Sequence, residues 1–126
     1  MRTLRKYHKK TQRQKVRHKL DKLWSQKVRS IGKCEFCGSK DSLNGHHIYS
    51  RTNLATRWDL NNGVCLCSGC HVFRSLSAHK SPMEFSEWLI EQRGEEWLSE
   101  LRLKAKSVVK YTIADLEDIL ERLDND

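Results

Sequence analysis

The chain has 126 residues, of which 37% are hydrophobic and 32% charged, and it carries a net charge of +8. This length suits one small domain or a compact core with appended helices, and so lean an apolar content favours a bound metal as added support. No apolar run approaches the ~18 residues of a membrane span, and the basic N-terminus has no apolar stretch behind it, so we expect neither a transmembrane segment nor a secretory signal.

Positive charge is concentrated in the first quarter of the chain. Residues 1–33 hold thirteen Lys and Arg against one acid, Asp21, whereas the remaining residues have a net charge of −4. A basic segment of this density attracts polyanions by neutralising phosphates and releasing counterions. A solvated tail would have a similar composition. We favour contact with nucleic acid, because the motifs further along the chain agree with it.

Residues 1–32 are expected to form a basic arm followed by an amphipathic helix. Residues 1–10 have no apolar period and are interpreted as a flexible arm. A helix is predicted over about 12–30, ending at Ile31 and Gly32, because apolar residues recur at helical spacing between Lys and Arg. These apolar residues are Val16, Leu20, Leu23, Trp24 and Val28.

Residues 33–80 differ in kind, since they contain all five Cys and four of the six His. Glycines beside these residues indicate tight turns around a metal. Regular structure should therefore be short. We expect a turn at 34–37, a strand near 42–47, an irregular loop over 49–61, a strand near 63–66 and a helix that begins near 68–70.

Residues 81–126 are predicted to be a helical extension. Ser81 and Pro82 resemble the start of a helix that Gly94 ends, a second helix follows, and Thr112 should cap a third. The aromatic and leucine residues of this region are interpreted as core. Whether these helices only cover the core, dimerise or dock on a partner is left open.

Two Cys-x-x-Cys pairs predict a structural zinc. Two residues between thiols let both sulfurs reach one tetrahedral ion, and four thiolates suit a closed site. The pairs are separated by 29 residues, which leaves room for a functional insert. The fifth cysteine, Cys65, is interpreted as a buried free thiol. In a reducing compartment such as the cytoplasm, the zinc ligands would be Cys34, Cys37, Cys67 and Cys70.

Histidines within and after this insert indicate a second metal site. Four thiolates already close the zinc sphere, and His71, next to Cys70 on the expected helix, should point away from it. A divalent ion beside a neutral imidazole suits phosphodiester hydrolysis, because the ion neutralises phosphate charge and the imidazole accepts a proton from water. His46, His47 and His71 are candidates for such a site, and His79, eight residues past His71, is a weaker candidate for a third ligand.

The pattern His46-His47, Asn62 and His71 within residues 33–75 resembles the HNH (ββα-metal) endonuclease family in its zinc-stabilised, four-cysteine variety. The resemblance implies an α+β fold with a small ββα-metal core. It implies that His47 is the general base and that Asn62 holds the loop and orients that base. His46 and His71 would bind the catalytic ion. Because the family usually has Asp at the position of His46, the replacement by His shifts the metal preference from Mg²⁺ towards Mn²⁺, Ni²⁺ or Zn²⁺.

The resemblance makes a metal-dependent DNA endonuclease the first hypothesis, with Arg51 and Arg57 gripping phosphates beside the scissile bond. A looser similarity of residues 47–97 to the phage NinG/Rap recombination proteins suggests a phage or prophage origin. Because small phage HNH proteins often work beside a packaging terminase, the HNH resemblance implies a role in DNA packaging or recombination in the host cytoplasm, with a terminase as partner. Two alternatives stay open: a non-catalytic zinc module that binds DNA or protein, and a recombination factor specific for branched junctions.

Overall fold

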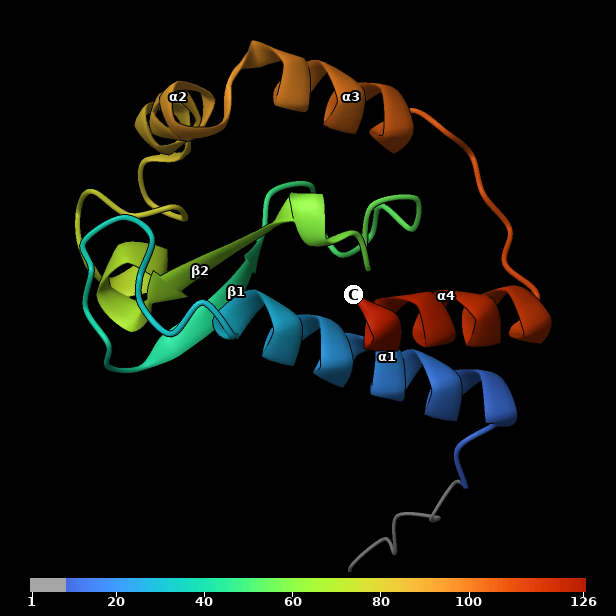
Figure 1. The fold of residues 1–126 in the computed structure, drawn as a ribbon. Coiled ribbons are helices and arrows are strands. Elements are labelled where there is room, and N and C mark those ends of the chain that lie inside the picture. Colours follow the sequence, from blue (N-terminus) through green and yellow to red (C-terminus); the bar gives the residue numbers. More distant parts are fainter. Residues whose placement is uncertain (1–8) are drawn as a thin grey trace, which may run out of the picture.

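The computed structural model describes residues 9–126, so most of the expected flexible arm, 1–10, lies outside the described residues. Helical segments surround one two-stranded sheet, and this mixed architecture confirms the predicted α+β class (Figure 1). The segments are α1 (Gln12–Arg29), β1 (Leu43–His47), the 3₁₀ turn η1 (Leu60–Asn62), β2 (Gly63–Cys67), the π-helical turn η2 (Gly69–Phe73), α2 (Pro82–Arg93), α3 (Glu95–Ala105) and α4 (Ile113–Asn125).

The sheet is an antiparallel pair in which His46 lies opposite Val64 and His47 lies opposite Gly63. All of β2 is buried. Val64 and Leu66 of this strand belong to a core that also contains three of the cysteines and the apolar face of α2. The sheet therefore joins the cysteine-rich segment to the C-terminal helices.

A second core lies between α1 and α4, which run side by side (Figure 1). The spacing of apolar residues predicted both helices, and a Thr cap with a side chain returning from the third helical position starts each of them. Burying each large apolar side chain contributes about 1.5–3 kcal/mol. The buried members are Val16, Leu20, Trp24, Trp58, Leu116 and Leu123.

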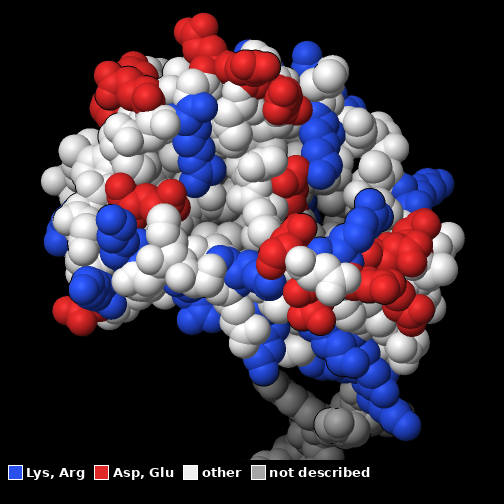
Figure 2. Space-filling model, viewed as in Figure 1, with Lys and Arg blue, Asp and Glu red and all other residues white. Residues whose placement is uncertain are grey.

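Opposite charges are concentrated on the N-terminal helix and on the C-terminal helices. Figure 2 shows Lys and Arg along α1 beside the Asp and Glu of α4, with further acids over α2 and α3. Within residues 9–126, no helix has the length and apolar character that crossing a membrane requires.

A helix was expected to begin at the second cysteine pair, and a helix that carried both His71 and His79 would have to reach residue 79. The observed helical segment, η2, is much shorter. It ends after one π-helical turn, which the bond from Arg74 N–H to Gly69 O closes. Serine hydroxyls then compete with helical hydrogen bonding. The hydroxyl of Ser77 donates to Val72 O and accepts from Lys80 N–H, and that of Ser81 donates to Ser75 O. Residues 74–81 consequently fold back over η2.

Candidate functional site

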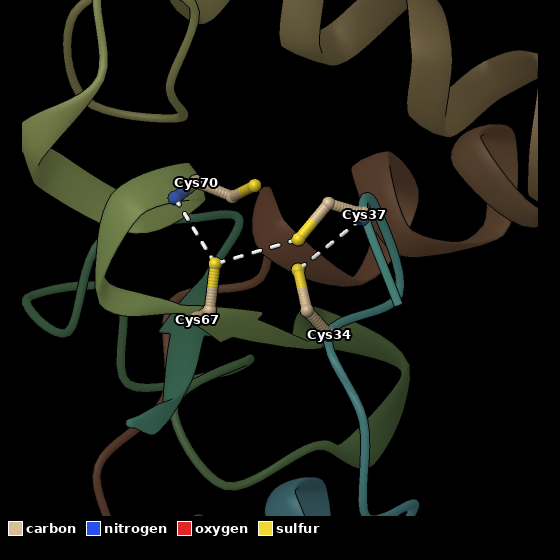
Figure 3. A group of neighbouring side chains, drawn as sticks. All are labelled: Cys34, Cys37, Cys67 and Cys70. Carbon is tan, nitrogen blue, oxygen red and sulfur yellow. Dashed lines mark hydrogen bonds between the residues drawn. The ribbon is translucent and has the colours of Figure 1, made fainter. Parts of the chain in front are cut away.

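The four paired cysteines converge, although 29 residues separate the two pairs (Figure 3). Their sulfurs all lie within 4.8 Å of one another, and Cys37 Sγ is 3.6 Å from Cys67 Sγ. Zinc–sulfur bonds of ~2.3 Å in a tetrahedron place sulfurs ~3.8 Å apart. The cluster is therefore compatible with a structural zinc bound by Cys34, Cys37, Cys67 and Cys70.

Local hydrogen bonds prepare these sulfurs for a cation. In each pair the backbone N–H of the second cysteine donates to the sulfur of the first, at 3.4 Å. A backbone hydrogen bond from Ser39 lowers the pKa of the Cys37 thiol to about 6, whereas burial raises the pKa of Cys70. The Arg74 guanidinium donates to Cys70 Sγ at 3.5 Å. These donors favour thiolate, which is the form that binds zinc, whereas burial opposes it at Cys70.

Cys65 stays outside the cluster, as predicted for a buried free thiol. Its backbone pairs with Glu35, which accepts from Cys65 N–H through its carboxylate and donates to Cys65 O through its own N–H. Arg93 binds the same carboxylate at 3.3 Å. These contacts tie the first cysteine pair to β2 and α2.

Three histidines from β1, η2 and the loop that follows η2 form a second cluster. His46 and His71 were predicted to share an ion, and His79 joins them, with one ring nitrogen of each within 4.8 Å of the others. The Nε2 atoms of His71 and His79 are 3.0 Å apart. The backbone bond from His79 N–H to His71 O, 3.2 Å long, places His79 there. The folded-back loop, and not helical spacing, brings the third imidazole to the site.

Two of these imidazoles, those of His46 and His71, favour the neutral form. Burial, followed by the neighbouring histidines, lowers the pKa of His46 to about 3, and burial also lowers the pKa of His71. A neutral imidazole is the form that binds a metal. A donor set of nitrogens without a carboxylate suits Zn²⁺, Ni²⁺ or Mn²⁺ better than Mg²⁺. The residues present therefore fit a divalent transition metal.

His47 faces α1, away from the contacts that His46 makes. Its Nε2 lies 3.0 Å from Arg57 O. A carbonyl only accepts hydrogen bonds, so in the neutral ring Nε2 carries the proton and Nδ1 has a free lone pair. Burial lowers the pKa of His47, against the opposing effect of the bond to Arg57. The ring is thus a neutral base with a defined tautomer.

Asn62 is fully buried and fastens the loop that follows β1. Its Oδ1 accepts from Tyr49 N–H at 2.7 Å, and its Nδ2 donates to Tyr49 O and Thr56 O. Its own carbonyl accepts from Ile48 N–H. Because Arg57, whose carbonyl binds His47, directly follows Thr56, Asn62 reaches the base only through the loop backbone.

The two arginines proposed to contact DNA have different surroundings. Arg57 is 13% exposed and forms a two-pronged ion pair with Asp21 of α1, 2.8 Å at its shorter contact. Arg51 is 64% exposed and lies 3.7 Å from the same carboxylate. Arg51 is therefore accessible to a phosphate, whereas the guanidinium of Arg57 is engaged within the fold.

A cavity of about 600 Å³ lies away from both clusters. It lies among the loop that precedes β2, the end of α3 and α4, and Figure 2 shows this face to be hollowed. The ion pair between Lys104 and Asp59, 2.7 Å long, is on its wall. None of the predicted site residues lines it.

His79 was expected as a third ligand from helical spacing, which the structure does not have between His71 and His79. Trp24 and Asp21 were assigned no role in the site from the sequence. A signal for His79 was the serine-rich stretch 75–81, which favours side-chain bonds to backbone over a continued helix. Asp21 was marked by being the one acid among residues 1–33. Trp24 had no signal beyond the apolar period that also fits a core residue.

Comparison with known proteins agrees with this geometry. The family model described as HNH endonuclease matches residues 34–75, about a third of the chain. Searches of curated proteins and of solved structures give no match to this chain. The match indicates nuclease or DNA-binding activity in general, with DNA as substrate or partner. Segment 34–75, which contains the four-cysteine cluster, is therefore similar to the HNH endonuclease family.

Proposed function

We propose that this protein is a metal-dependent DNA endonuclease that hydrolyses phosphodiester bonds. The observation that carries the proposal is the pairing of a three-imidazole cluster with His47, whose Nε2 is fixed on a backbone carbonyl. A non-catalytic DNA-binding module has no need for an imidazole of defined tautomer beside three clustered ones. The four cysteines would hold a structural zinc and set the position of η2.

His47 is proposed as the general base. Its Nε2–H is committed to Arg57 O, so Nδ1 is the atom that accepts a proton from the attacking water. Because its pKa is lowered, the ring is ready to accept that proton at neutral pH. The bond to Arg57 O then stabilises the imidazolium, since a charged donor strengthens it.

His46, His71 and His79 are proposed to hold the catalytic ion. When bound, a divalent ion neutralises charge on the scissile phosphate and stabilises the leaving oxygen. His46 and His71 belong to the segment that matches the HNH model, and His79 lies four residues beyond its end. We expect His79→Ala to weaken Mn²⁺ activation on the order of 10-fold or more, while Lys80→Ala leaves it near wild type.

The substrate is held by positive charge close to the loop of residues 49–61. Arg51 is exposed there and is proposed to contact a phosphate. Arg57 is proposed to hold the loop, since its side chain is engaged by Asp21. The Lys and Arg of α1 extend the proposed footprint along the duplex, which makes binding strongly dependent on salt.

The test is cleavage of supercoiled plasmid with Mg²⁺, Mn²⁺, Ni²⁺ or Zn²⁺. His47→Ala should lower the cleavage rate at least ~100-fold, as loss of a general base does, and should leave the zinc content and the circular dichroism spectrum unchanged. His18→Ala, which removes an exposed histidine of α1, is the control. Full activity of His47→Ala would refute the assignment. A salt-sensitive mobility shift without nicking in any ion would favour the non-catalytic zinc module.

A narrower proposal from the sequence concerns biological context. We propose that cleavage serves phage DNA packaging or recombination, with a terminase as partner, in the host cytoplasm. Cleavage of four-way junctions in preference to linear duplex would support recombination. Retention of a purified terminase large subunit on the immobilised protein would support packaging.

A further inference from the structure

A side chain outside the HNH-matched segment covers the face of the proposed base. The indole of Trp24, on α1, stacks on His47 with ring centroids 3.7 Å apart and planes inclined by 10°. Trp24 is 2% exposed. We infer that Trp24 is a positioning residue for His47, so that α1 completes the catalytic site instead of only adding positive charge. This inference rests on the proposed function of His47.

Two glycines of the sheet admit the indole. A Cβ on Gly45 would lie 3.1 Å from Trp24 Cζ3, and a Cβ on Gly63 would lie 2.9 Å from Trp24 Cζ2 and 2.5 Å from Val28 Cγ2. Gly63 is the residue opposite His47 in the ladder. The strands therefore lack side chains where α1 must approach, and the indole reaches the face of the imidazole.

The indole is fixed in its own plane as well. Its Nε1–H donates to Asp59 O at 2.9 Å, and Trp24 is a buried member of the core that α1 shares with α4. The Asp59 carboxylate accepts from Asn61 N–H and pairs with Lys104. An indole fixed by its hydrogen bond to Asp59 O and by core packing does not move with the imidazole that stacks on it, so it restricts rotation of the His47 ring.

The edge of the imidazole is fixed from the same helix through another route. Asp21, three residues before Trp24, binds the side chain of Arg57, and the carbonyl of Arg57 accepts from His47 Nε2. Residues three apart on a helix share a face. One face of α1 thus sets both the plane of the imidazole, through Trp24, and its hydrogen-bonded edge, through Asp21 and Arg57. Nδ1 is left as the free edge.

The experiment compares Trp24→Leu and Trp24→Phe with Leu20→Ala, a buried change one turn earlier in the same core. Plasmid nicking is measured at a temperature at which circular dichroism shows every variant folded. Trp24→Leu should lower kcat on the order of 10- to 100-fold, because a misplaced base loses that much rate. KM for DNA should stay within about twofold, because Trp24 makes no ground-state contact with substrate. Trp24→Phe should recover most of the rate, since it restores a ring under the imidazole.

Nuclear magnetic resonance gives a readout that stability alone does not move. The ring protons of His47 should resonate upfield in the wild type because they lie over the indole. They should return towards the positions of exposed histidines in Trp24→Leu and stay upfield in Leu20→Ala. Together with a kcat loss confined to Trp24→Leu, this pattern would establish the positioning role.

The inference fails if Trp24→Leu loses no more rate than Leu20→Ala, or if the loss is in KM and not in kcat. A wild-type protein that cuts no DNA in any divalent ion would instead refute the proposed function, and with it any catalytic role for Trp24. The first two outcomes leave the nuclease assignment standing, so the two failures are distinguishable.

Discussion

The cysteine-rich segment and the α1–α4 pair differ in what holds them together. Around the cysteines, regular structure is limited to five-residue strands and single turns, and four thiols converge where a metal fits. Between α1 and α4, two long helices bury leucines, valine and tryptophan against each other. One region therefore combines an apolar core with a proposed zinc site, whereas the other has an apolar core without a cysteine cluster, and the proposed catalytic base lies where the two meet.

Removing the proposed zinc should have the largest effect and should act on one side of this division. Structural zinc contributes on the order of 10 kcal/mol, which is comparable to the entire stability of a small domain. Cys70→Ser, or chelation of the wild type, should therefore abolish the fold of residues 34–80. Amide chemical shifts of this segment, together with zinc content by mass spectrometry, would measure it.

Cys65→Ala provides the matched control for that experiment. Cys65 is buried, as Cys70 is, but lies outside the cluster. This variant should keep one zinc per chain and lose about 1–2 kcal/mol, as expected of a small cavity. Equal losses in Cys65→Ala and Cys70→Ser would contradict the distinction between ligand and core.

A smaller effect is expected on the helical side. Leu116, 1% exposed on α4, packs against α1. Leu116→Ala should lower the free energy of unfolding by about 3 kcal/mol, through lost burial and the cavity that remains. Urea denaturation measures this loss, and zinc content should not change. Leu103→Ala, at a side chain 73% exposed on α3, should have an effect within about 0.5 kcal/mol.

Most of the fold was predictable, because the spacing of apolar residues and the residues that start and end helices agree along much of the chain. The apolar spacing of α1, the Ser81-Pro82 start of α2 and the Thr112 cap of α4 are local signals, and they placed these helices within a residue or two. The helix that includes Cys70 ends earlier than helical spacing to His79 implies, because the hydroxyls of Ser77 and Ser81 bond to backbone groups of the loop, which the local pattern does not reveal.

The candidate site was predictable only where ligand spacing constrains it. Two Cys-x-x-Cys pairs fix each other's distance through tetrahedral chemistry, so their convergence follows from sequence. Trp24 and His47 are joined by tertiary packing across more than twenty residues, and the apolar period that places Trp24 on the inner face does not say which ring it meets. Asp21 was visible as an isolated acid, but its partners were not.

Asp21 connects the two regions. Its removal should have a smaller effect than loss of the zinc site or Leu116→Ala. Burial opposes ionisation of this carboxyl, but hydrogen bonds from Arg57 and Trp58 outweigh it, so the pKa lies below its usual value of 3.8. Asp21→Asn should cost about 2 kcal/mol at pH 7, the range of hydrogen bonds to a charged group.

The pH dependence of this cost has a definite sign. A carboxyl with a lowered pKa stabilises the folded state above its unfolded-state pKa, and this contribution is lost as the pH falls through the folded-state value. The stabilities of wild type and Asp21→Asn should therefore differ by a constant amount from pH 7 to about pH 5 and converge below 3.8. Urea denaturation across this range measures the difference. A gap that stays constant to pH 3 would mean that the packing of α1 on the loop, and not the charge of Asp21, joins the base to the helical core.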